Sequence, residues 1–325
     1  MMETNNDAQN SRVKKLRGFL IKLAVSLILI LVYIIFIQDI SFGDIWRPIQ
    51  HASLLWLAAA LSLHGIGQLI SAIRWKILIQ AQGDRIPLLF LVQSYLVGMF
   101  FNLFLPGRIG GDVVRIWDSS RYSLSVSKSS AVVVVERLQG ILVLFGFALA
   151  GSLLRLPFAG RYPVIWMALG LSLVGFLVFF LFLLPPAERL LHRLPEKGWG
   201  ARVKTPVLAF RNTILHYRTQ KPAFIRAMGM SLCLQLNVIL YYFFITKALH
   251  LTLPIIDFFI FIPIVHFVTL IPITVNGLGL REMSFGEILK VYGLTAQAGI
   301  SLGLVDFGFI IIVGLIGGLL FLLRK

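Results

Sequence analysis

Long apolar runs separated by short polar stretches form the dominant pattern along the chain. Eight such runs occur, at residues 18–37, 53–73, 87–105, 129–153, 162–184, 223–246, 256–275 and 298–323. A helix of about 20 apolar residues spans the hydrocarbon core of a bilayer, which is about 30 Å thick. The pattern therefore predicts an all-α polytopic membrane protein.

Composition supports this prediction and limits the classes of function. The chain has 325 residues, 58% of them hydrophobic and 14% charged, whereas a soluble domain carries about 25% charged residues. The net charge of +16 comes from basic residues interleaved with the apolar runs. Such residues indicate orientation and contact with lipid headgroups, so no nucleic-acid partner is expected. The single cysteine, Cys233, excludes an internal disulfide and a cysteine metal cluster.

The distribution of Lys and Arg tests whether all eight runs cross the membrane. Eight full spans would place the loop 185–221, with its eight Lys and Arg, outside the cell. This contradicts the tendency of cytoplasmic loops to be basic. If the third and seventh runs are re-entrant, 23 Lys and Arg are cytoplasmic and 6 are external. We therefore expect six spans, two re-entrant hairpins and cytoplasmic termini, with Arg74-Trp75-Lys76 as an interfacial anchor.

Two matching motifs indicate an internal repeat. Pro106, Gly111 and Arg115 share the pattern P-x4-G-x3-R with a second set 166 residues later, Pro272, Gly277 and Arg281. The same shift aligns Ser129 with Thr295. Three full spans separate the hairpins, so they open on opposite faces, as in the inverted repeats of many transporters.

The expected organisation follows from this repeat. A basic N-terminus, 1–17, precedes a first repeat at 18–153 with its hairpin at 87–127. A second repeat follows at 154–325, with its hairpin at 256–295. The alternative to each hairpin is an amphipathic loop on the headgroups.

The motifs also suggest how an anionic group could be bound. A helix beginning at Gly111 or Gly277 would direct free N–H groups at the break, and arginine suits bidentate contact with phosphate. Pro106 and Pro272 would break the hairpins. The alternative is ordinary capping and snorkelling. The candidate substrate-binding residues are Arg108, Gly110, Gly111, Asp112, Arg115, Gly277, Gly279, Arg281 and Glu282.

Ionisable residues inside apolar runs are costly and therefore functional candidates. Glu136 and Arg137 lie in the fourth run, and Asp306 lies in the last. Their depths allow contact if these helices are neighbours, which predicts one charge cluster. A neutral pair that joins two helices is the alternative. No His or carboxylate spacing indicates a metal site, and no cofactor is expected.

Four segments together resemble a known family. They are "RWKILI" at 74–79, "FNLFLPGRIGGDVVR" at 101–115, "AVVVVERL" at 131–138 and "NGLGLREMSF" at 276–285. The chain resembles the lysylphosphatidylglycerol synthase transmembrane-region family, also called flippase-like membrane proteins. The resemblance implies a prokaryotic cytoplasmic-membrane protein associated with lipid movement between leaflets, without the soluble aminoacyl-transferase domain of bifunctional members. Two positions depart from the pattern: Asp112 replaces a frequent Glu, and Gly140 occupies the place of an expected carboxylate.

The leading hypothesis is a flippase, not an enzyme, that moves a phosphate-containing lipid. A phospholipid, an aminoacyl-phospholipid and a polyprenyl-phosphate carrier all fit, and anionic membrane lipids are the expected partners. No Walker motif is present, so transport would use a gradient or run downhill. The alternatives are an intramembrane lipid-modifying transferase and an accessory scaffold for lipid-synthesis enzymes.

Overall fold

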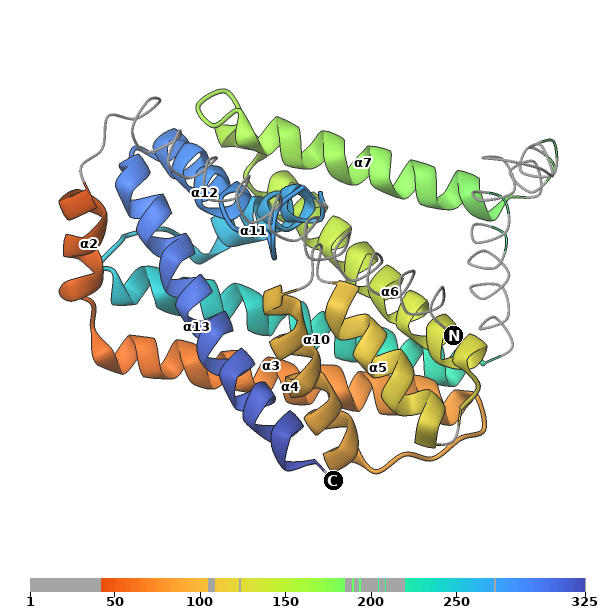
Figure 1. Cartoon of the computed structure of the whole chain (residues 1–325). Coiled ribbons are helices and arrows are strands. Elements are labelled where there is room, and N and C mark those ends of the chain that lie inside the picture. The colour runs from red at the N-terminus through yellow and green to blue at the C-terminus, as the bar shows by residue number, and fades with distance from the viewer. Residues whose placement is uncertain are drawn as a thin grey trace, which may run out of the picture.

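The computed structural model describes residues 42–104, 109–122, 124–184, 220–271 and 273–324, and the single residues 189, 193, 204 and 208. Every regular element in these ranges is a helix (Figure 1). The expected span at 18–37 and most of the loop 185–221 lie outside the described residues. So do Pro106, Arg108 and Pro272.

The helices fall into two series of the same order. The first contains α2 (Phe42–Gln50), α3 (Leu54–Ala81), α4 (Leu88–Phe104), α5 (Ile109–Tyr122) and α6 (Val126–Leu154), followed by a short 3-10 turn, η3 (Leu156–Phe158), and α7 (Val164–Leu183). The second contains α10 (Lys221–Ala248), α11 (Ile255–Thr269), α12 (Leu280–Val291) and α13 (Ala296–Leu323). In both, two short helices stand between two long ones.

Helix length and composition confirm a polytopic α-helical membrane protein. Five helices, α3, α6, α7, α10 and α13, are long and apolar enough to cross a membrane. The short apolar helices α4 and α11 have 17 and 15 residues. At 1.5 Å per residue they extend about 26 and 23 Å, less than the bilayer core of about 30 Å. The inverted orientation of the two series across a membrane stays a prediction.

The end of α3 differs from the expected span. The helix continues to Ala81 and buries both Arg74 and Trp75. The interpretation of Arg74-Trp75-Lys76 as an interfacial anchor is therefore wrong for its first two residues. The reason is local, because Arg74 has a buried carboxylate partner, described below.

The two series exchange partners as they pack. The long helices α3 and α10 lie side by side across the molecule (Figure 1). Each series' first short helix packs on the long helix that follows the two short helices of the other series, α4 on α13 and α11 on α6. Helix α7 lies at one edge, where it packs on α6 and α11. The largest hydrophobic core joins α6, α10, α11 and α13. The interior is therefore built jointly by both series.

Similar N-caps set the register of α6 and α13. The Ser125 hydroxyl accepts the N–H of Lys128, and the Thr295 hydroxyl accepts the N–H of Ala298, which satisfies donors that a helix start leaves open. These caps are 170 residues apart, so Thr295 corresponds to Ser125. The alignment of Thr295 with Ser129 by a 166-residue shift is wrong.

Glycines permit the close packing of the short helices. A Cβ at Gly98 of α4 would lie 3.0 Å from Cα of Gly111 on α5. A Cβ at Gly317 of α13 would overlap the backbone of Leu96 on α4. The α4–α5 pair is thus held backbone to backbone, both internally and against α13.

Candidate functional site

A cavity of about 300 Å³, lined by charged, amide and aromatic side chains, lies between the two series. Its lining comes from α3, α4, α5, α6, α10, α11 and α13, together with Asn276 from the turn between α11 and α12. The first motif contributes Gly111, Asp112 and Arg115, and Arg137 and Asp306 also line the cavity. Residues from both predicted hairpins therefore meet at one cavity.

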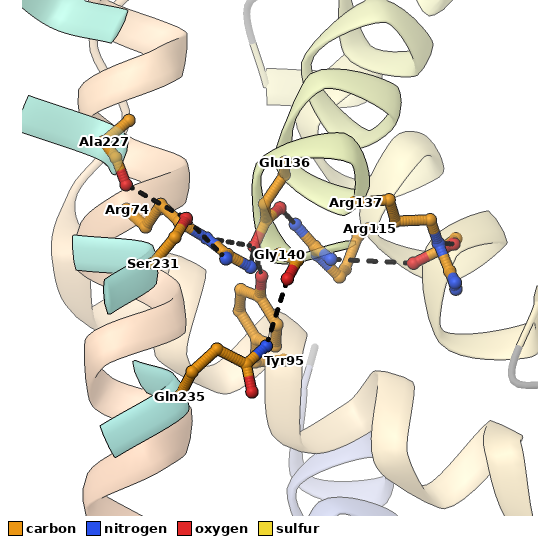
Figure 2. A network of polar contacts seen from close by, with 10 residues as sticks. Arg74, Tyr95, Arg115, Glu136, Arg137, Gly140, Ala227, Ser231 and Gln235 are labelled. Atoms are coloured by element: carbon orange, nitrogen blue, oxygen red, sulfur yellow. Dashed lines mark hydrogen bonds and ion pairs between the residues drawn. The ribbon is translucent and has the colours of Figure 1, made fainter. Parts of the chain in front are cut away.

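Glu136 is the centre of the first charge cluster. Its side chain accepts hydrogen bonds from Arg74, from Arg115 and from the Tyr95 hydroxyl. The Arg74 Nη2 to Glu136 Oε1 distance is 2.7 Å. Glu136 is 1% exposed, and Figure 2 shows it between the two arginines. A buried charge is costly without partners. Two arginines and a phenol supply those partners and hold this carboxylate in place.

Arg74 connects the two series directly. Its Nη1 donates to the Ser231 hydroxyl on α10 at 3.0 Å, and Ser231 donates to the Ala227 carbonyl (Figure 2). Beside it, Gln235 of α10 lies 3.5 Å from the Gly140 carbonyl of α6. A Cβ at Gly140 would lie 3.8 Å from Arg74 Nη1. A carboxylate at position 140 would therefore also be close to this arginine.

Arg115 is held by aromatic rings as well as by Glu136. Its guanidinium lies 4.4 Å from the ring centroid of Trp75 and 3.9 Å from that of Tyr95. The residue is 6% exposed, and cation–π contacts strengthen when water is excluded. Its Nε has no hydrogen-bond partner among the described residues. Arg115 thus keeps one buried donor that no described residue satisfies.

Arg137 is more accessible than the other arginines of these clusters. It pairs with Asp112 of α5, and its side chain is 40% exposed. Asp112 also lies 3.6 Å from Arg115 Nη1, beyond good hydrogen-bond range. Arg137 can therefore exchange its protein partner for a bound anion more readily than Arg115 can.

The second cluster surrounds Arg281, which is 1% exposed. Its Nη2 lies 3.0 Å from Glu282 Oε1, and its Nη1 lies 2.7 Å from Asp306 Oδ2. Tyr241 donates its hydroxyl to Asp306 at 2.5 Å, and Tyr242 donates at 3.3 Å. Side chains of the protein therefore surround Arg281, and it does not line the cavity.

The two clusters share one plan. Arg115 and Arg281 lie on the second short helix of their series, and each pairs with a carboxylate of the following long helix. Glu136 lies ten residues after the first residue of α6, and Asp306 lies ten after the first residue of α13. Arg74 and Tyr241 both lie twenty residues after the start of α3 and α10, and both donate to that carboxylate.

The expectation of free N–H groups at the hairpin glycines is wrong at two positions. The Gly111 N–H donates to Asn102 Oδ1 at 2.7 Å. The second short helix begins at Leu280, not at Gly277, and its N-cap Gly279 donates its N–H to Glu282 at 2.6 Å. Gly279 has φ +88° and Gly277 has φ +79°, which suits glycine. The protein's own side chains therefore occupy these helix starts.

The single charge cluster of Glu136, Arg137 and Asp306 is also corrected. Glu136 pairs with Arg74 and Arg115, Arg137 pairs with Asp112, and Asp306 pairs with Arg281. Successive residues of a helix point about 100° apart. Glu136 and its neighbour Arg137 consequently meet different partners.

Two candidates remain. Gly110 is buried in α5 beside Gly111, and Arg108 lies outside the described residues.

The sequence analysis missed Tyr95, Tyr241 and Tyr242 and misinterpreted Arg74. Tyrosines in apolar runs have no distinctive spacing, but the matching positions of Arg74 and Tyr241 could have been found with a 167-residue shift.

Comparison with known proteins gives one positive result. No curated protein matches the chain in sequence. The family model described as "Lysylphosphatidylglycerol synthase TM region" matches residues 19–318, which includes both clusters and the cavity between them. The chain therefore belongs to the lysylphosphatidylglycerol synthase TM region family and is a multi-pass membrane protein with a lipid-related function.

Proposed function

We propose that the protein moves a phosphate-containing lipid between the leaflets of a prokaryotic cytoplasmic membrane. The observation that carries the proposal is that two arginines and two carboxylates line the cavity within a bundle of apolar helices. Charged groups at this depth are costly unless they are paired or line a wet path. A headgroup could occupy the cavity while its acyl chains remain in the bilayer.

The arrangement of the helices supports transport over a fixed binding site. Two pairs of short helices, α4–α5 and α11–α12, contribute to the cavity, and each pair packs against both series. In an inverted repeat the two pairs would open towards opposite faces, and rocking of one series against the other would expose the cavity alternately. The termini are then cytoplasmic, and lipid-synthesis enzymes are possible partners.

Arg137 is the residue we expect to meet the phosphate first, with Arg115 beside it. Arg137 is accessible and lines the cavity, and arginine binds phosphate through two parallel N–H donors. The sequence placed Arg281 among the candidate substrate-binding residues. Its 1% exposure and two carboxylate partners favour a positioning role instead.

A flipping assay in proteoliposomes tests the proposal. The purified full chain would be reconstituted with phospholipids that carry a fluorescent label on an acyl chain, and dithionite would bleach the label in the outer leaflet. Arg137→Gln should slow the bleaching of inner-leaflet lipid about tenfold, because a charge-assisted contact contributes about 1.5–3 kcal/mol. Arg161→Gln is the matched control, because Arg161 is exposed and absent from the cavity lining.

Two outcomes would contradict the proposal. The first is a bleaching rate equal to that of protein-free vesicles for every labelled lipid. The second is an equal effect of the two arginine substitutions. Chemical conversion of the lipid during the assay would favour a transferase, and activity only with an added synthase would favour a scaffold.

A further inference from the structure

Two parts of the cavity lining differ in chemistry. Arg115 and Arg137 form one part, named here the arginine lining. The other, the aromatic lining, is a row of rings in which His64 lies 5.4 Å from Tyr241, Tyr241 lies 4.9 Å from Tyr242, and Tyr242 lies 6.3 Å from His266. A ligand in the cavity therefore meets cations in one part and ring faces and edges in the other.

The paired charges give the two linings opposite polarity. The first cluster has a net charge of +1, because it contains three arginines and two carboxylates: Arg74, Arg115, Arg137, Glu136 and Asp112. The second cluster has a net charge of −1, because Arg281 has two carboxylate partners, Glu282 and Asp306. Four arginines thus balance four carboxylates, and the site is neutral but polarised. Charges in a low-dielectric interior act over longer distances than in water.

Neutrality disfavours a headgroup with net negative charge. Such a ligand would have to compete with a carboxylate at every arginine of the two clusters, and it would also face the excess negative charge near Asp306. Arg115 still has an unpartnered Nε at 6% exposure, and its Nη1 lies 3.6 Å from Asp112. The arginine lining can accept one phosphate, but the site as a whole favours a compensating positive charge.

We infer that the cavity binds a zwitterionic headgroup of the phosphoethanolamine type, with its phosphate at Arg115 and Arg137 and its ammonium against Tyr241 and Tyr242. This inference rests on the proposed function and names its substrate class. Tyrosine faces attract ammonium groups, more strongly where water is excluded. The excess negative charge of Asp306 and Glu282 behind these rings adds to the attraction.

Equilibrium binding tests the inference without requiring transport. The detergent-solubilised full chain would be titrated calorimetrically with dihexanoyl phosphatidylethanolamine and with dihexanoyl phosphatidylglycerol. Phosphatidylethanolamine should bind about tenfold more tightly, because a desolvated cation–π contact and its charge complement contribute roughly 1–2 kcal/mol. Equal affinities, or tighter binding of phosphatidylglycerol, would overturn the inference.

Three variants separate the two halves of the headgroup. Tyr242→Leu removes a ring and should weaken phosphatidylethanolamine binding several-fold without changing phosphatidylglycerol binding. Tyr242→Phe keeps the ring and should preserve the preference, and unchanged phosphatidylglycerol binding shows that the variants fold. Arg137→Gln removes a phosphate contact and should weaken both lipids by the same factor. If Tyr242→Leu weakened both lipids equally, the ammonium would not lie at the aromatic lining.

The same titration distinguishes the source of the headgroup and the fate of the proposed function. Acyl-free glycerophosphoethanolamine should bind more weakly than the lipid, and equal affinity would overturn a lipid as the source. Preferential binding without flipping would contradict the transport proposal and leave the inference intact. Flipping together with equal affinity for both lipids would support the transport proposal and contradict the inference about the headgroup.

Discussion

The charge clusters around Glu136 and Asp306 have the same framework and different surroundings. In each, an arginine of the second short helix meets a carboxylate at the same position of the following long helix. The first cluster adds Arg74 at the place where the second has Tyr241. The comparison shows that the two series share the central ion pair and differ in the third partner.

A second difference lies beside the motif arginines. Glu282 follows Arg281 and caps the start of α12 through the Gly279 N–H, whereas Ile116 follows Arg115. In the first cluster, Asn102 of α4 accepts the Gly111 N–H instead. The first cluster thus has one arginine more than it has carboxylates, and the second has one carboxylate more than it has arginines. This difference makes the two parts of the cavity lining opposite in charge.

Membrane sidedness is the sharpest way to break the comparison, because the expected result is all or none. With Cys233, which is exposed, replaced by Ala, single cysteines would be placed at Lys128 and Lys290. Both lysine side chains are at least 37% exposed. An inverted repeat predicts labelling of position 128 from the cytoplasmic face and of position 290 from outside. A membrane-impermeant maleimide on intact cells and inverted vesicles measures this, and labelling of both from one face would exclude inverted symmetry.

Loss of the first carboxylate should have the largest effect on stability. Glu136→Gln leaves Arg74 and Arg115 buried without their shared counter-charge, which costs roughly 3–5 kcal/mol. Thermal unfolding in detergent should show a large fall in midpoint. Glu287→Gln is the matched control: its salt bridge with Lys290 is exposed, and such a pair contributes about 0–1 kcal/mol. Similar midpoints for the two variants would contradict the central role of Glu136.

The corresponding change in the second cluster should be milder. Asp306→Asn removes one partner of Arg281, but Glu282 remains 3.0 Å from Nη2 of that arginine. We expect a loss of about 1.5–3 kcal/mol, the contribution of a charge-assisted hydrogen bond. The same unfolding measurement ranks the two variants. We expect the first cluster to depend more on its carboxylate than the second does. A larger loss of stability for Asp306→Asn than for Glu136→Gln would contradict this.

Much of the fold was predictable from sequence because apolar length determines it. The runs at 129–153 and 298–323 lie within α6 and α13, and the runs at 87–105 and 256–275 contain the short helix α4 and most of the short helix α11. The end of α3 was not predictable, because Arg74 reads as an interfacial residue until its partner on α6 is known. A charge inside an apolar helix is interpretable only together with its neighbours in space.

The site was predictable in its residues and not in its pairings. The motif arginines, Glu136 and Asp306 stood out because charge in an apolar run is rare. Their pairings lie within each series and depend on the rotation of each helix and on which helices are neighbours, which sequence spacing does not encode. The linkers between motif arginine and carboxylate also differ in length, so a fixed 166-residue shift hides the correspondence of Glu136 with Asp306.

The smallest expected effect tests the equivalence of Arg74 and Tyr241 directly. Arg74→Tyr introduces the partner that the second cluster uses, and its hydroxyl can donate to Glu136 as Tyr241 donates to Asp306. Arg74→Leu removes the donor altogether. Arg115 and Tyr95 still hold Glu136 in both variants, so Arg74→Tyr should be the more stable by about 0.5–1.5 kcal/mol, one hydrogen bond. Thermal midpoints compare the pair, and equal midpoints would mean that the two positions match in sequence register but not in geometry.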